Sequence, residues 1–178
     1  MAVRRCVGGV QPLAGIHAVR TMQTQTKTAR DHVLEVEIAG EEFYKKLAQT
    51  APEPLDEVFS RLAAEEHEHH ETLSKAFDVG NIPVLHESDI ADVAHNIYKS
   101  IEKDRGMSKD MKSLLDIYIQ ARDMEAKNRD HYFKLAEEEK NPEAKKLWEF
   151  MALEEHKHYK AMDEMVKFVT DTDVWYYW

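Results

Sequence analysis

Hydrophobic residues recur every three or four positions along most of the chain, and most of the few glycine and proline residues lie outside these stretches. This period is typical of amphipathic α-helices. It predicts long helices over residues 31–50, 55–78, 109–139 and 142 to about 169. The segments APEP (51–54), VGNIP (79–83) and KNPEA (140–144) contain proline and mark the breaks. A shorter helix is expected near 88–104, with Ser88 as its N-cap and Gly106 after its end.

The two halves of the chain repeat one another. EVEIAGEEFYKKLA (35–48) aligns with DMEAKNRDHYFKLA (123–136), and FSRLAAEEHEHH (59–70) aligns with WEFMALEEHKHY (148–159). The repeat predicts two helical hairpins joined by a long crossover that contains the short helix. This all-α architecture is the ferritin-like four-helix bundle. We expect residues 31–170 to form this bundle, because 178 residues are enough for one domain with a core and too few to argue for two.

Charge and composition exclude several classes of function. The formal net charge of −10 argues against nucleic acid as a partner. No apolar run approaches the roughly 18–20 residues of a membrane span. The single cysteine, Cys6, can form neither an internal disulfide nor a four-cysteine zinc site. Any metal site must therefore be built from histidine and carboxylate side chains.

The ends of the chain differ from the bundle. Residues 1–30 carry five basic residues and no acidic residue, which is typical of a transit peptide for the mitochondrion or a related organelle. A disordered extension, or a translation start at Met22, would explain the same composition and leave a cytoplasmic protein. The aromatic tail at 171–178 contains DVWYYW, which would pack on the bundle, on a partner subunit or at a membrane interface. We expect a homodimer.

The segment EEHEHHETL (65–73) gathers metal-binding side chains on one helix. The apolar stripe of that helix should pass through Glu66 and His69, whereas Glu65, Glu68 and Glu71 are expected to point elsewhere. The repeat places Glu155 and His158 in the same way on the last helix. On the remaining two helices, the stripes include Glu37 and Glu125.

Four carboxylates and two imidazoles would then face one interior. Burying unpaired carboxylates costs several kcal/mol each, and bound cations remove this cost. One glutamate from each of two helices and a Glu-x-x-His pair from each of the others are the ligands of dinuclear carboxylate proteins. Oxygen and imidazole ligands suit two iron ions, although manganese or a mixed pair has the same ligands. The alternative is an acidic bundle with buried Glu–His and Glu–Lys pairs.

These residues resemble the rubrerythrin family of ferritin-like diiron proteins. The resemblance covers roughly residues 31–169 and rests on two repeated motifs. They are E-x6-Y-x2-L-A, which begins at Glu37 and again at Glu125, and A-x-E-E-x-x-H, which ends at His69 and again at His158. It implies that Glu37 and Glu125 are terminal ligands, that Glu66 and Glu155 bridge two metals, and that each histidine completes one metal. The activity it implies is reduction of hydrogen peroxide, or oxidation of ferrous iron by oxygen.

The sequence departs from the family pattern at two points. Members with peroxidase activity usually carry a further glutamate where this chain has Asn128, whose repeat mate is Gly40. Many members also carry a four-cysteine rubredoxin domain, which the single cysteine excludes from these 178 residues. An external electron donor, either a rubredoxin-like protein or a reductase, is therefore expected.

Three further residues lie close to the predicted ligands. Tyr44 and Tyr132 are expected either to hydrogen-bond a ligand carboxylate or to fill the core. Glu41 would be a spare carboxylate for the site, or a solvated residue at the edge of the stripe. Three functions remain open: a peroxide- or oxygen-reducing diiron oxidoreductase, a ferroxidase or iron-handling protein, and a structural subunit with a non-catalytic metal site.

Overall fold

The computed structural model describes residues 29–79, 82–104 and 113–171. Its helices are α1 (Ala29–Thr50), α2 (Leu55–Val79), α3 (Ile90–Asp104), α5 (Leu115–Glu138) and α6 (Pro142–Thr170). No strand occurs in these described ranges. The predicted all-α fold class is therefore confirmed. Within the same residues, no helix combines the length and apolarity that a bilayer span requires.

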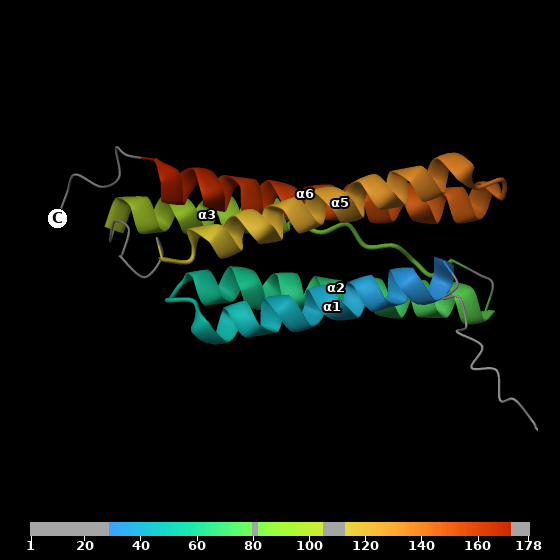
Figure 1. The fold of residues 1–178 in the computed structure, drawn as a ribbon, viewed down its shortest axis with the longest axis horizontal. Coiled ribbons are helices and arrows are strands. Elements are labelled where there is room, and N and C mark those ends of the chain that lie inside the picture. The colour runs from blue at the N-terminus through green and yellow to red at the C-terminus, as the bar shows by residue number, and fades with distance from the viewer. Residues whose placement is uncertain (1–28, 80–81, 105–112, 172–178) are drawn as a thin grey trace, which may run out of the picture.

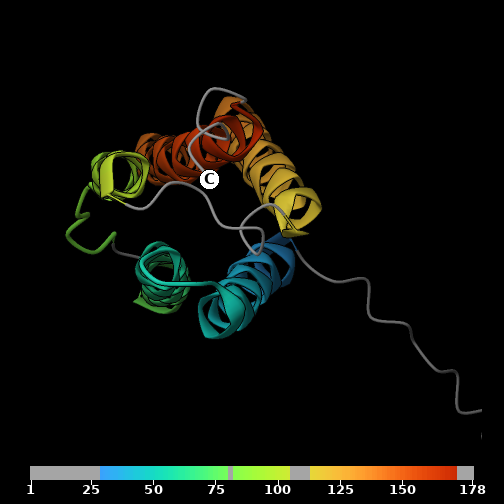
Figure 2. The same cartoon turned by 90° about the vertical axis from the view of Figure 1, so that its left-hand side faces the viewer.

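The helices form two antiparallel hairpins that face each other. Figure 1 shows α1 packed along α2 and α5 packed along α6, with the crossover running between the two pairs. The short helix α3 packs mainly on α6 and also contacts α2. Viewed from the end in Figure 2, the four long helices enclose one shared interior. This is the ferritin-like arrangement that the repeat predicts.

The ends of several helices follow local chemistry. Asn141 is the N-cap of α6, and its side chain accepts hydrogen bonds from the backbone amides of Glu143 at 2.9 Å and Ala144 at 3.2 Å. Pro142 occupies the first turn, where its missing N–H costs nothing. Asp56 and Glu57 lie in the first turn of α2, where negative charge favours a helix start.

Some helix boundaries differ from the predicted ones. The helix predicted from residue 109 is interrupted at Leu114, which has φ −98° and ψ 4°, so that α5 begins at Leu115. Ser113 before this break is helical, and residues 109–112 lie outside the described residues. The short helix inside the crossover begins at Ile90, so its N-cap is Asp89 and not Ser88. The first helix begins at Ala29, two residues before the predicted start. Gly106, residues 1–28 of the predicted leader and residues 172–178 of the predicted tail lie outside the described residues.

The hydrophobic core consists of two clusters. One surrounds Tyr44, Phe59 and Tyr118 and includes residues of α3. The other surrounds Tyr132 and Trp148 toward the opposite end of the bundle. Along each long helix, the predicted ligands fall between members of the first cluster and members of the second. The polar site therefore lies between two apolar layers that hold its helices in place.

Candidate metal centre

The six predicted ligands all lie inside the bundle. Glu37 comes from α1, Glu125 from α5, and one Glu-x-x-His pair comes from each of α2 and α6. None of these residues is more than 6% exposed, and the six are Glu37, Glu66, His69, Glu125, Glu155 and His158. Such burial of four carboxylates and two imidazoles is rare unless the groups are paired or bind a cation.

His69 faces carboxylates from both hairpins. Its Nδ1 atom lies 3.3 Å from Glu37 Oε2, 3.3 Å from Glu155 Oε1 and 3.9 Å from Glu66 Oε2. His69 therefore contacts one glutamate of its own hairpin at short range and one glutamate of the opposite hairpin.

His158 makes the related set of contacts from the other side. Its Nδ1 atom lies 3.2 Å from Glu66 Oε1 and 3.9 Å from Glu125 Oε2. The two imidazole rings stack with centroids 5.2 Å apart. Ligand atoms of Glu66, His69, Glu155 and His158 all lie within 4.8 Å of one another. This grouping is compatible with a dinuclear metal site.

Two tyrosines form hydrogen bonds with Glu37 and Glu125, the glutamates that α1 and α5 contribute. The Tyr44 hydroxyl on α1 donates to Glu125 Oε1 on α5. The Tyr132 hydroxyl on α5 donates to Glu37 Oε1 on α1. Each tyrosine thus orients the carboxylate of the opposite hairpin, and both hydroxyls belong to the buried core.

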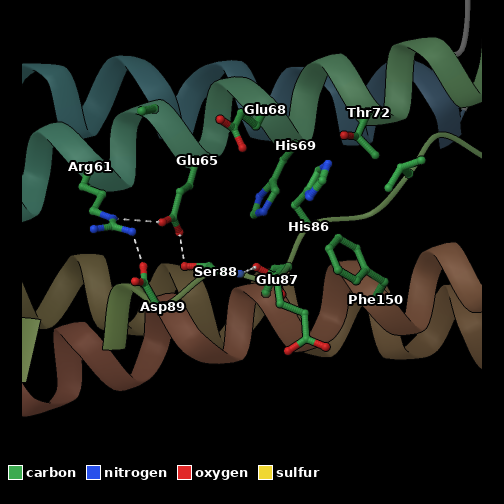
Figure 3. A pocket seen from close by; sticks show the side chains of 13 residues that line it. Arg61, Glu65, Glu68, His69, Thr72, His86, Glu87, Ser88, Asp89 and Phe150 are labelled. Atoms are coloured by element: carbon green, nitrogen blue, oxygen red, sulfur yellow. Dashed lines mark hydrogen bonds and ion pairs between the residues drawn. The ribbon is translucent and has the colours of Figure 1, made fainter. Parts of the chain in front are cut away.

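Glu65 reaches the site, although the sequence suggested that it would point elsewhere. Its Oε2 atom lies 3.0 Å from His158 Nε2, whereas Nδ1 of the same ring contacts Glu66 and Glu125. Figure 3 shows Glu65 between Arg61 of its own helix and Ser88 of the crossover. The sequence signal for Glu65 is the pair of adjacent glutamates that occurs in both repeats. Helical phase alone places Glu65 off the apolar stripe and therefore does not identify it as a site residue. A carboxylate on the remote nitrogen fixes the orientation of a metal-binding imidazole.

Other candidates lie farther out. Glu41 contacts Lys45 and His67 (3.1 Å to His67 Nδ1) on the outer side of the first hairpin, which favours the alternative of a residue at the edge of the stripe over a spare carboxylate for the site. Asn128, one turn after Glu125, is half-buried.

The electrostatics of the cluster reflect its excess of carboxylates. Burial, followed by repulsion from neighbouring glutamates, raises the pKa of Glu66, Glu125 and Glu155 well above the ordinary value. Burial also opposes ionisation of Glu37, but contact with His69 and the hydrogen bond from Tyr132 bring its pKa below the ordinary value. In His69, burial is outweighed by Glu37 and other carboxylates, and the pKa rises to about 9.

Many polar atoms of the cluster form no hydrogen bond. Eight buried side-chain atoms of the described residues have no hydrogen-bond partner, and five belong to predicted ligands: Glu37 Oε2, His69 Nδ1, Glu125 Oε2 and both carboxylate oxygens of Glu155. Buried polar atoms are normally satisfied. Carboxylate oxygen and imidazole nitrogen atoms that converge in this way fit divalent metal ions, which would pair with the free atoms and neutralise the charge.

A family model for rubrerythrin matches residues 33–166, which include all six of these side chains. The chain belongs to the rubrerythrin family. Neither the curated proteins nor the solved structures yield a match to it. The matched range extends from the first turns of α1 into the last turns of α6, so the family assignment covers the whole four-helix bundle.

One backbone feature of this rubrerythrin-family chain bears directly on the cluster. A β-carbon placed on Gly40 would lie 2.9 Å from Cδ of Glu66 and 3.0 Å from its Oε2. Such an approach is too close for a side chain. The backbone of α1 therefore passes directly beside the Glu66 carboxylate, and the glycine leaves the space that this carboxylate occupies.

Proposed function

We propose that this chain is a non-haem diiron-carboxylate oxidoreductase that reduces hydrogen peroxide or oxygen. The observation that carries the proposal is the buried cluster of Glu37, Glu125 and two Glu-x-x-His pairs. Five of its atoms lack hydrogen-bond partners, although the cluster is closed off between two apolar layers.

The contacts support different roles for the four glutamates, two as bridging ligands and two as terminal ligands. Glu66 lies close to both histidines, at 3.2 Å from His158 Nδ1 and 3.9 Å from His69 Nδ1, which suits a bridging carboxylate. Glu155 occupies the equivalent position in the repeat and lies 3.3 Å from His69 Nδ1. Glu37 and Glu125 each contact a single histidine, which suits terminal ligands.

When bound, two iron ions would supply the electrons that reduce the oxidant to water. The chain itself provides orientation and a buried site between two apolar layers. Burial, together with the adjacent Glu125 carboxylate, raises the pKa of Tyr44 well above its ordinary value, and burial and Glu37 do the same for Tyr132. Both hydroxyls therefore stay protonated near neutral pH and donate to the terminal carboxylates.

Reduction of one peroxide molecule to two water molecules takes two electrons and two protons. We propose that the electrons reach the resting protein from an external donor, because this sequence holds no four-cysteine donor domain. A rubredoxin-like protein or a flavin reductase has the appropriate chemistry.

Asn128 favours a second candidate function. A half-buried amide stands one turn after Glu125, where a further glutamate would add a seventh ligand. A site with six ligands and no built-in electron donor suits oxidation of ferrous iron by oxygen, with iron as the substrate. A ferroxidase or iron-handling protein is therefore the alternative.

Anaerobic titration of the full chain with Fe²⁺ would test the proposal, followed by stopped-flow mixing with hydrogen peroxide or with oxygen. We expect two ions per chain and faster oxidation by peroxide. Two ions with faster oxidation by oxygen would favour the ferroxidase. Failure to bind iron in stoichiometric amounts would refute both.

A further inference from the structure

The crossover is fastened to both hairpins at Ser88. The Ser88 hydroxyl donates to Glu65 Oε2 on α2 at 2.6 Å, and the Ser88 backbone amide donates to Glu154 Oε2 on α6 at 2.9 Å. The same hydroxyl oxygen accepts from the backbone amide of Ile90 at 2.9 Å. A serine hydroxyl has one proton, and here that proton is committed to Glu65.

Glu65 passes this constraint on to the metal cluster. One oxygen, Oε2, receives both the Ser88 hydroxyl and the Nε2–H group of His158. The other, Oε1, lies 3.5 Å from Arg61 Nε. Glu65 is thus held from three sides, and the His158 ring is fixed with Nδ1 toward Glu66 and Glu125.

The repeat shows that this arrangement is specific to one half of the site. The repeat mate of Glu65 is Glu154, which is buried. Its Oε2 atom accepts from the Ser88 amide, and its Oε1 atom accepts from Lys157 at 2.8 Å. Ser88 therefore forms hydrogen bonds with Glu65 of one hairpin and Glu154 of the other. Of these two glutamates, only Glu65 forms a described hydrogen bond with a histidine of the cluster.

We infer that Ser88 is a positioning residue for the metal centre, which acts through Glu65 to fix the orientation of the His158 ring. The inference rests on the proposed function in so far as His158 binds metal. A cavity of about 280 Å³ lies beside this relay and is lined by residues of α2, α6 and the crossover, including His69 and Ser88 (Figure 3). Because this side of Glu65 is open space, its polar contacts hold it more than packing does, and Ser88 supplies the shortest of these contacts.

The test compares five variants of the full chain with the wild type: Ser88→Ala, Ser88→Thr, Glu65→Ala, the double variant of Ser88→Ala with Glu65→Ala, and Glu87→Gln. Ser88→Thr keeps the hydroxyl. Glu87→Gln is the matched control, because Glu87 is the neighbouring crossover residue, its side chain is 85% exposed, and its carboxylate pairs with Lys157 at 3.6 Å. Thermal unfolding verifies that each variant folds.

The first measurement is anaerobic titration with Co²⁺, a divalent probe that oxygen does not readily oxidise in such sites. Loss of a carboxylate partner of a ligating histidine typically weakens metal binding about 10- to 100-fold. We expect Ser88→Ala to weaken the binding of one of two Co²⁺ ions by about tenfold and Glu65→Ala by more. The double variant should bind no more weakly than Glu65→Ala alone, because both changes break one chain of contacts.

The second measurement is hydrogen exchange of the His158 Nε2 proton in the metal-free protein, followed by NMR. We expect faster exchange in Ser88→Ala and Glu65→Ala, and wild-type exchange in Ser88→Thr and Glu87→Gln. Unchanged exchange in Ser88→Ala would overturn the inference, as would equal acceleration in Glu87→Gln. If the wild type bound no Co²⁺, the proposed function would fail, but the exchange rates would still decide the role of Ser88.

Discussion

Tyr44 on α1 donates a hydrogen bond to Glu125 Oε1 on α5, so that one hydroxyl joins two helices of different hairpins. Tyr132 makes the reciprocal bond to Glu37. The two hydrogen bonds are equivalent under the internal repeat, as if a two-fold axis related the two hairpins. Each bond satisfies a buried carboxylate oxygen and aims the other oxygen of that carboxylate at the cluster.

Removing one of these hydroxyls should destabilise the bundle. Tyr44→Phe leaves a buried carboxyl group without its donor, which typically costs about 1–3 kcal/mol. We expect that loss in the free energy of unfolding of the metal-free protein, measured by urea denaturation. Tyr118→Phe is a matched control, because Tyr118 is fully buried and its hydroxyl forms no hydrogen bond. Equal losses in the two variants would show that the Tyr44 bond contributes nothing.

Glu66 is the residue whose loss should affect metal binding most. Glu66→Gln replaces a carboxyl group, whose ionisation burial and the neighbouring glutamates oppose, with a neutral amide. We expect the metal-free variant to have a higher thermal midpoint than the wild type, and Fe²⁺ loading to fall from two ions per chain to at most one. Metal analysis after anaerobic loading checks the second result. Glu41→Gln, on the outer side of the same hairpin, should change neither, and retention of two ions by Glu66→Gln would refute the bridging role.

The fold could be predicted from the sequence because its signals are periodic and occur twice. The stripe of α6, including Met151, Met162 and Met165, is buried as the helical period requires. The start of α5 could not be predicted in this way. Leu114 continues the apolar pattern, and its backbone angles show a break in the helix that the pattern does not contain.

The site residues also fall into those that helical periodicity predicts and those that it does not. Glu37 and Glu125 were found because they lie on stripes that packing forces inward. Glu65 was missed because its side chain lies off the stripe and reaches His158 across the gap between hairpins. Its place depends on the path of the crossover and on Ser88, and helical phase carries no information about either.

Gly40 should be essential to the geometry of the cluster. Replacing a glycine inside a helix with alanine normally stabilises the helix by about 0.5–1 kcal/mol. In Gly40→Ala the new β-carbon would lie 2.9 Å from Glu66 Cδ, so the carboxylate must shift. We expect at least tenfold weaker Co²⁺ binding, measured by titration, with helical content unchanged by circular dichroism. Wild-type affinity in this variant would show that Glu66 does not need its present position.

The metal-free protein should lose stability as the pH rises. Burial opposes the charge on His69, but Glu37 and its neighbours raise the pKa from 6.5 to about 9. The protonated His69 therefore adds to the free energy of unfolding. This contribution is complete below pH 6.5 and is lost as the pH rises through about 9. The raised pKa values of Glu66, Glu125 and Glu155 act in the same direction above the ordinary value of 4.5.

Bound metal should stabilise the protein more strongly as the pH rises, which opposes the loss of stability expected of the metal-free form. Metal ions compete with protons for the same carboxylates and imidazoles, so the affinity for metal rises as these groups lose their protons. We expect the thermal midpoint of the metal-free chain to fall between pH 6.5 and 9, and the increase produced by excess Mn²⁺ to grow over the same range. Differential scanning calorimetry of both forms would measure it. A metal-free midpoint that rises across this interval would show that His69 is not held protonated by the surrounding carboxylates.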